Sequence, residues 1–196
     1  MATIKLLLGI ICFAFAGSYG LFTGNLLNRI SSTVSAKHFE TSQKEAEQRT
    51  NLIRIAQKEI GTREKTGNND GRRIKEYLNK VRLKEGNPYC AAFVSWVYAQ
   101  GGFDSPRSGW SPDLFPGIRL ARSALPGNVL GIYFQEYKRI AHVGLIVKQE
   151  GNYLISIEGN TNLAGSREGE GVYLKKRHIK TIYKMADWVS ERRSIK

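Results

Sequence analysis

The stretch Asn87-Pro88-Tyr89-Cys90-Ala91-Ala92-Phe93-Val94-Ser95-Trp96 places a cysteine directly after a turn-forming Asn-Pro pair and at the head of an apolar run. The run continues to Gln100, is apolar on nearly every face, and is followed by two glycines that stop a helix. A helix that is hydrophobic all round is buried. The sequence therefore predicts a central helix over 89–100, with Cys90 in its first turn.

A lone cysteine is usually buried and inert, so the role of Cys90 depends on the residues around it. The only other cysteine is Cys12, which lies in the apolar N-terminal segment and leaves Cys90 without an intramolecular disulfide partner. The three histidines, His38, His142 and His178, are not at metal-ligand spacing from Cys90 or from one another. We therefore expect no metal and no cofactor.

Composition limits the class of protein. The chain has 196 residues and a hydrophobic fraction of 41%, which suits one packed domain with appendages and excludes disorder throughout. It carries 30 Lys and Arg against 17 Asp and Glu, a formal charge of +13. This excess favours an anionic partner such as a wall polymer, a lipid surface or nucleic acid.

The N-terminus is typical of an export signal, with Lys5, a short apolar run over 6–15 and the small-residue pattern Ala14-Phe15-Ala16. An uncleaved anchor is the alternative, because residues 20–27 would extend the run toward the about 20 residues that cross a bilayer. A buried N-terminal helix is a third, less favoured interpretation. The expected organisation is a signal peptide or membrane anchor over 1–24, a polar tether over 25–50, a folded domain over 51–190 and a basic tail over 191–196. The protein is then exported, to the periplasm or cell envelope.

Helical and extended patterns follow one another along the chain. Apolar residues at helical spacing predict helices over 52–60 and 74–81. Alternating runs bounded by turns predict strands over 129–134, 141–148, 152–158 and 171–177. Helices followed by strands predict an α+β fold in which N-terminal helices pack on a small antiparallel β-sheet.

A predicted hairpin brings a histidine and a carboxylate together. Gln149-Glu150-Gly151 has the length and the final glycine of a three-residue hairpin loop. If Lys148 faces Asn152, then His142 faces Glu158 across the two strands. Directly opposed Cβ atoms lie about 4.5–5.5 Å apart, so the carboxylate can bind one ring nitrogen and leave the other free.

Such a pair provides the base and the orienting group that an activated cysteine requires. The helix dipole would favour the thiolate of Cys90, and the free N–H of the first helical turn could bind an oxyanion. Each residue also has an ordinary structural explanation. His142 alone would more often be a core or surface residue, Asn160 a turn residue, and Trp110 a residue that closes off the core.

Several motifs occur in a characteristic order: Ile60-Gly61 with Glu64, Thr66-Gly67-Asn68-Asn69-Asp70-Gly71, Tyr89-Cys90-Ala91-Ala92-Phe93-Val94, Leu125-Pro126-Gly127-Asn128, Ala141-His142-Val143-Gly144 and Ile157-Glu158-Gly159-Asn160-Thr161-Asn162. By this order and spacing, residues 52–188 resemble the CHAP amidohydrolase/peptidase domains, which are papain-like enzymes that cut peptidoglycan. The resemblance implies a papain-like fold with Cys90 as nucleophile and His142 as general base. It further implies that Glu158 and Asn160 orient the histidine.

Two positions depart from the family pattern. Asn128 stands where an aspartate commonly follows Pro-Gly, and Tyr89 stands where a tryptophan commonly precedes the cysteine. These departures remove no catalytic group but leave the substrate preference open. We expect Tyr89 and Trp110 to contact the substrate.

Together, these features predict an exported cysteine hydrolase that cleaves an amide of peptidoglycan through a Cys-His-Glu triad and a thioester. It would act as an N-acetylmuramoyl-L-alanine amidase or as a stem or crossbridge endopeptidase. The alternative is a noncatalytic module that binds the wall or belongs to a secretion or conjugation apparatus. A nucleic-acid binder would explain the charge, but no such module is recognisable and an export signal argues against it. The expected partners are peptidoglycan and anionic wall polymers.

Overall fold

The computed structural model describes residues 16–164 and 169–191, with side chains from residue 37 onward. The chain divides into two compact units, 1–44 and 45–196. Helix α1 (Ala16–Gln57) supplies the described part of the first unit and continues into the second. The predicted signal peptide or anchor falls mainly on residues 1–15, outside the described part. Within the described ranges, none of the helices has both the length and the apolar character needed to cross a membrane.

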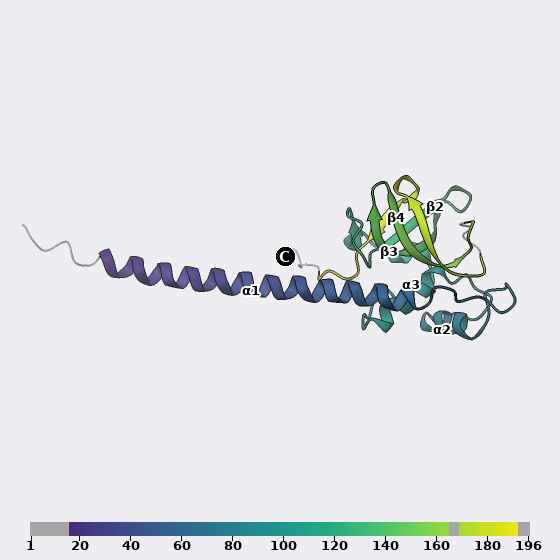
Figure 1. The fold of residues 1–196 in the computed structure, drawn as a ribbon, viewed down its shortest axis with the longest axis horizontal. Coiled ribbons are helices and arrows are strands. Elements are labelled where there is room, and N and C mark those ends of the chain that lie inside the picture. The colour runs from purple at the N-terminus through teal and green to yellow at the C-terminus, as the bar shows by residue number, and fades with distance from the viewer. Residues whose placement is uncertain (1–15, 165–168, 192–196) are drawn as a thin grey trace, which may run out of the picture. The chain divides into compact units, whose positions relative to one another are not determined.

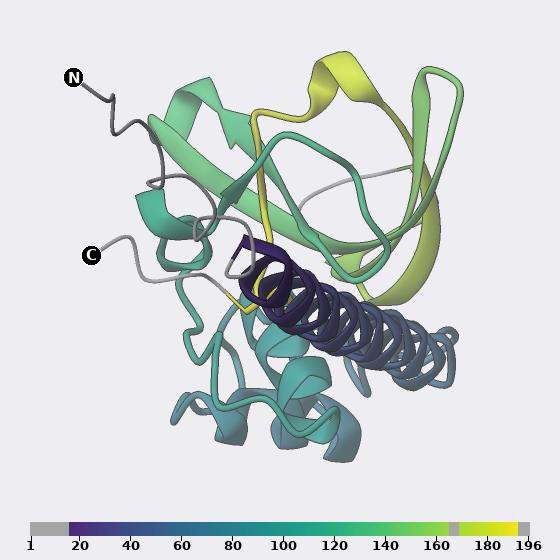
Figure 2. The ribbon, with the colours of Figure 1, turned by 90° about the vertical axis from the view of Figure 1, so that its left-hand side faces the viewer.

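The second unit contains a six-stranded sheet in which every neighbouring pair of strands is antiparallel, in the order β1-β6-β2-β3-β4-β5 (Figures 1 and 2). The strands are β1 (Leu120–Ala121), β2 (Val129–Phe134), β3 (Arg139–Glu150), β4 (Tyr153–Thr161), β5 (Gly171–His178) and β6 (Lys184–Ala186). Four of them match the predicted strands. The two short ones, β1 and β6, contain too few residues to show an alternating pattern.

Helices α2 (Arg72–Lys80) and α3 (Cys90–Gln100) lie together on one side of the sheet (Figure 1). The central helix is confirmed, because every α3 residue from Cys90 to Tyr98 is buried, and the helix contacts α2, β3 and β4. The α+β prediction, with helices packed on an antiparallel sheet, is therefore confirmed. Short 3₁₀ helices complete the described fold at Ser111–Leu114, Gly117–Arg119, Gln135–Tyr137 and Ile179–Thr181.

The compact unit begins at Glu45, earlier than the predicted boundary at residue 51. Residues of the predicted tether are helical, and their C-terminal part belongs to the core. Arg49, Leu52 and Ala56 are buried, at the three- and four-residue spacing of one helix face. The sequence pattern missed this extension because the first buried residue of the face is an arginine, which a search for apolar residues does not count.

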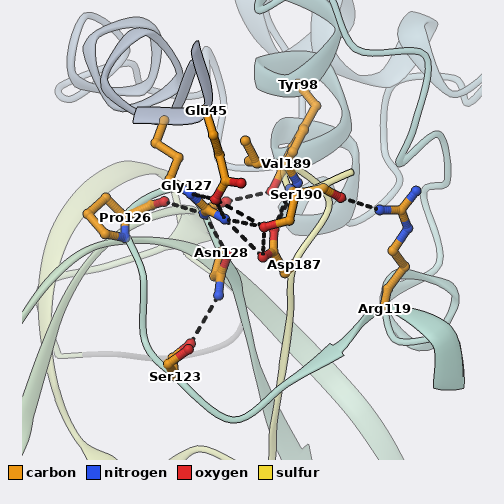
Figure 3. Close-up of polar contacts among 11 residues, drawn as sticks. Glu45, Tyr98, Arg119, Ser123, Pro126, Gly127, Asn128, Asp187, Val189 and Ser190 are labelled. Carbon is orange, nitrogen blue, oxygen red and sulfur yellow. Dashed lines mark hydrogen bonds and ion pairs between the residues drawn. The ribbon is translucent and has the colours of Figure 1, made fainter. Parts of the chain in front are cut away.

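Arg49 is buried because other parts of the chain satisfy its guanidinium group. It donates to Asp187 Oδ2, Asn128 Oδ1 and the Pro126 carbonyl, each at 2.9 Å. Figure 3 shows Asn128, Asp187 and Ser190 converging beside the part of the helix that carries Glu45. This cluster fastens α1 to the loop before β2 and to the segment after β6.

The β3–β4 hairpin corrects the predicted register. Glu150 pairs with Tyr153, so the turn contains two residues, Gly151 and Asn152, and Gly151 has the positive φ of 56° that such a turn needs. Lys148 pairs with Ile155 rather than facing Asn152, and a β-bulge follows between Ile146 and Lys148. The prediction that His142 lies directly opposite Glu158 is therefore wrong.

Candidate active site

Cys90 is the first residue of α3, and the carboxamide of Asn160 caps this end of the helix. The Tyr89 N–H donates to Asn160 Oδ1 at 3.0 Å, and Asn160 Nδ2 donates to Asn69 Oδ1 at 2.8 Å. Asn160 adopts a left-handed φ of 57°, which asparagine tolerates better than most residues. The described contacts of Asn160 thus position the helix that carries the cysteine, rather than His142 as the resemblance implies.

The thiol of Cys90 is almost fully buried, with 4% of the residue exposed. Its sulfur lies 3.5 Å from Ser111 Oγ, which comes from the loop and 3₁₀ helix after α3. Although burial alone would raise the pKa of the Cys90 thiol, interactions with His142, Ser111 and the backbone of Val143 lower it below its ordinary value. Ser111 is a site residue that the sequence analysis missed, because a lone serine beside a proline reads only as a turn.

His142 and Glu158 meet despite the different register. Nε2 of the imidazole lies 2.8 Å from Oε2 of the carboxylate, and both side chains are buried. The other ring nitrogen, Nδ1, is buried and has no hydrogen-bond partner among the described residues. Cys90 and His142 each shift the pKa of the other, so the imidazole lies close enough to the thiol for the two groups to interact.

The contact between His142 and Glu158 is diagonal and passes over a glycine. Beyond the bulge, Leu145 pairs with Ile157 and Ile146 with Ser156. Continuing this register places Gly144 opposite Glu158. A Cβ atom at Gly144 would lie 2.5 Å from Glu158 Cγ, so the glycine provides the space in which the carboxylate side chain crosses to the histidine. Diagonal neighbours across a sheet are within reach of long side chains.

Glu158 is held by further groups that were not predicted. Arg177 on β5 donates from Nε to Oε1 at 3.0 Å and from Nη2 to Oε2 at 2.6 Å, and Ser156 Oγ donates to Oε1 at 2.6 Å. Sequence alone could not place Arg177 here, because the long connection between β4 and β5 leaves their pairing undetermined. The result is a row of four groups that alternate in the sign of their charge when ionised. They are the thiol of Cys90, the imidazole of His142, the carboxylate of Glu158 and the guanidinium of Arg177.

The contacts within this row determine the protonation states of its members. Burial alone would lower the pKa of His142, but interactions with Cys90 and Glu158 raise it to about 9. Burial alone would raise the pKa of Glu158, but His142 and Arg177 lower it to about 2. At neutral pH the carboxylate is therefore charged and the imidazole protonated, which favours the thiolate form of Cys90.

A pocket of about 380 Å³ opens beside the thiol. Its lining consists of Val81, Leu83, Asn87, Pro88, Cys90, Ser108, Gly109, Trp110, Ser111, Arg139 and Ala141. Trp110, predicted to contact substrate, is half exposed and lies in this lining. Tyr89 does not line the pocket: its side chain is fully buried in the core, with its ring centroid 6.2 Å from that of Tyr77.

Within residues 16–164 and 169–191, no group of three or more His, Cys, Asp or Glu side chains is arranged to hold a metal ion. A thiolate beside an imidazolium can attack an electrophilic carbon and then have the departing group protonated. The backbone N–H of Cys90, in the first turn of α3, has no intrahelical partner and can stabilise an oxyanion.

Comparison with known families gives no independent assignment. No family model matches the chain, and no curated protein matches its sequence.

Proposed function

We propose that this protein is a cysteine hydrolase with a papain-like arrangement of its site, and that it cleaves an amide bond of peptidoglycan. The observation that carries the proposal is the buried imidazole of His142. One of its nitrogens binds a carboxylate, and the other is free on the ring beside a thiol. This is the arrangement by which a base activates a nucleophile and is itself oriented by a third group. The pocket beside the sulfur gives a substrate access to it.

The reaction would proceed in two halves. The Cys90 thiolate attacks the amide carbon, and the resulting oxyanion accepts a hydrogen bond from the Cys90 N–H. His142 then protonates the leaving amine, the carbon–nitrogen bond breaks and a thioester remains. In the second half, His142 takes a proton from water, the hydroxide attacks the thioester carbon, and the carbon–sulfur bond breaks. The carboxylic acid product leaves, and the Cys90 thiolate and the protonated His142 are restored.

The choice of peptidoglycan rests on three features of the sequence. The motifs from Ile60 to Asn162 resemble those of CHAP domains, the N-terminal residues are typical of an export signal, and the formal charge of +13 suits anionic wall polymers. Both cleavage of the bond between muramic acid and the stem peptide and cleavage within the stem or crossbridge are consistent with these features.

The test is incubation of purified peptidoglycan with the wild-type protein and with Cys90→Ala, followed by identification of the released fragments and their new chain ends. We expect the wild-type protein to release fragments with a new amine and a new carboxyl group, and Cys90→Ala to release none. Equal release by both proteins would remove Cys90 from the mechanism. Binding of the wall without release by either would favour the noncatalytic module.

A further inference from the structure

The pocket beside Cys90 contains a positively charged side chain that the catalytic row does not use. Arg139 is the first residue of β3, and its guanidinium carbon lies 3.9 Å from the ring centroid of Trp110. One of its nitrogens donates to the Ile140 carbonyl at 3.1 Å. A cation–π contact with the indole and a backbone hydrogen bond hold the guanidinium group in place.

The remaining donors of Arg139 have no acidic partner in the part of the chain that the structure describes: none of the ion pairs there includes Arg139. The eleven residues of the pocket lining include no aspartate or glutamate. A guanidinium group has five N–H donors in a fixed plane, and the hydrogen bond to the Ile140 carbonyl uses only one of them. Arg139 can therefore donate hydrogen bonds to a ligand in the pocket, and its positive charge can attract an anionic group of that ligand.

Arg139 lies near His142 in the sequence and lines the same pocket as Cys90. Arg139 and Ala141 both line the pocket, and His142 follows Ala141 directly. The pairing of β2 with β3 is irregular at this point: Ile132 pairs with His142, whereas Tyr133 pairs with Ile140. Ala141 is therefore the extra residue of a β-bulge, a feature that often redirects side chains next to active sites.

We propose that Arg139 binds a carboxylate of the substrate close to the amide that is cut, so that the enzyme acts on peptides whose neighbouring carboxyl group is free rather than amidated. This inference rests on the proposed function and narrows its substrate class. Arginine suits the task because its planar fork binds both oxygens of a carboxylate, whereas an amidated carboxyl group carries no charge and presents only one oxygen.

The experiment compares two forms of the same substrate. Purified peptidoglycan fragments are used as isolated, with free carboxyl groups, and after chemical conversion of those groups to carboxamides. Cleavage is measured at about 0.15 M salt, so that general attraction between exposed charges is reduced. The proteins are the full-length wild type, Arg139→Gln, Arg139→Lys and, as a matched change of charge, Arg72→Gln. Arg72 lies on α2 with its side chain 98% exposed and is not part of the pocket lining.

We expect the wild-type protein to prefer the carboxylate form by about 10- to 100-fold in kcat/KM, the range of a charge-assisted hydrogen bond. Arg139→Gln should bring the ratio of the two rates close to one. Arg139→Lys, which keeps the charge but loses the fork, should retain part of the preference. Arg72→Gln should keep the wild-type ratio.

Equal cleavage of both substrate forms by the wild-type protein would overturn the proposal, as would an equal loss on both forms in Arg139→Gln. A loss on both forms together with a lower unfolding midpoint would show a structural role for Arg139. A binding measurement tests the role of Arg139 independently of the proposed hydrolase activity. The affinities of both fragment forms are measured for Cys90→Ala and for the double variant Cys90→Ala with Arg139→Gln. A carboxylate preference in binding that depends on Arg139 supports the proposal even if no bond is cut, and absence of that preference refutes it.

Discussion

At the scale of single residues, His142 is defined by the different surroundings of its two ring nitrogens. Nε2 binds Glu158, and Nδ1 has no hydrogen-bond partner among the described residues. A proton on Nε2 is therefore held by the carboxylate, whereas a proton on Nδ1 is available for transfer. In the proposed mechanism, Glu158 fixes which nitrogen transfers the proton and strengthens the basicity of the ring.

The same contacts predict a pH dependence. In the proposed mechanism the active form pairs a Cys90 thiolate with a protonated His142, so kcat/KM should fall as pH rises through the His142 pKa of about 9. Glu158→Gln removes one group that raises this pKa. The alkaline limb of the profile should therefore move toward neutral pH, and kcat/KM at neutral pH should fall by about 10²- to 10⁴-fold. The measurement is a pH–rate profile together with titration of His142 by NMR.

Glu136→Gln is the control for this substitution, because Glu136 is exposed on a short 3₁₀ helix. It should leave both the profile and the His142 titration unchanged. An alkaline limb at the same pH in Glu158→Gln and the wild-type protein would show that the carboxylate does not govern the imidazole.

At the scale of strands and helices, Gly144 decides whether Glu158 reaches the histidine. Gly144→Ala would place a methyl group 2.5 Å from Glu158 Cγ, in a strand where both neighbours are buried. We expect this substitution to lower the free energy of unfolding by about 1–3 kcal/mol, the usual cost of overpacking. It should also lower kcat/KM, because the carboxylate must move away from the imidazole. Urea unfolding and peptidoglycan cleavage measure the two effects.

Gly117→Ala is the matched control, because a Cβ there has no atom within 4 Å. Its free energy of unfolding should stay within about 0.5 kcal/mol of the wild-type value. If Gly144→Ala retained full stability and the wild-type titration of His142, the gap over the glycine would not be what positions Glu158.

The secondary structure shows which features the sequence could predict. The apolar run after Cys90 and the alternation over 129–134 are local patterns, and both appear where expected. The hairpin register depends on a choice between two- and three-residue turns and on the bulge before Lys148, which no local pattern reports. His142 and Glu158 were paired correctly by an incorrect register, because a long side chain can also reach a diagonal neighbour.

The less predictable parts of the site come from long-range packing. Arg177 and Ser111 lie on segments whose approach to the site depends on the path of the whole chain. The role of Asn160 was predicted as orienting a ring, but its carboxamide caps the helix that carries Cys90. A polar residue near a predicted catalytic motif can therefore contribute to the site by holding the backbone that carries another site residue.

At the scale of the whole folded unit, Arg49 joins its first helix to its last segment. The guanidinium group has 7% side-chain exposure and binds Asp187, whose side chain is 10% exposed. Replacing Arg49 by methionine leaves a buried carboxylate without its cation. We expect Arg49→Met to lower the free energy of unfolding by about 3–5 kcal/mol, as is typical when one partner of a buried pair is removed. Urea unfolding followed by circular dichroism measures this effect.

The double substitution Arg49→Met with Asp187→Asn should recover part of that loss, because no unpaired charge remains. Arg54→Met, at an exposed position on the same helix, should change stability by no more than about 0.5 kcal/mol. Equal stability of Arg49→Met and Arg54→Met would show that the cluster does not hold the unit together.

The Arg49 cluster also explains why an asparagine follows Pro126-Gly127. Asn128 is fully buried, accepts a hydrogen bond from Arg49 and donates one from Nδ2 to the Ser123 carbonyl at 3.0 Å. An aspartate would accept from Arg49 but could not donate to Ser123. The negative charge that balances Arg49 comes instead from Asp187 and from Glu45, 2.8 Å away.

The row of four groups from the Cys90 sulfur to Arg177 has a consequence for the order of events in the proposed reaction. Thiolate, imidazolium, carboxylate and guanidinium together carry no net charge, which makes their burial tolerable. Once an acyl group caps the sulfur, one negative charge disappears, and the ring loses one of the two partners that favour its protonation. Having delivered its proton to the departing amine, the ring would then stay neutral until water arrives. The change from proton donor to proton acceptor would thus follow from the chemistry of the intermediate itself, without any movement of the protein.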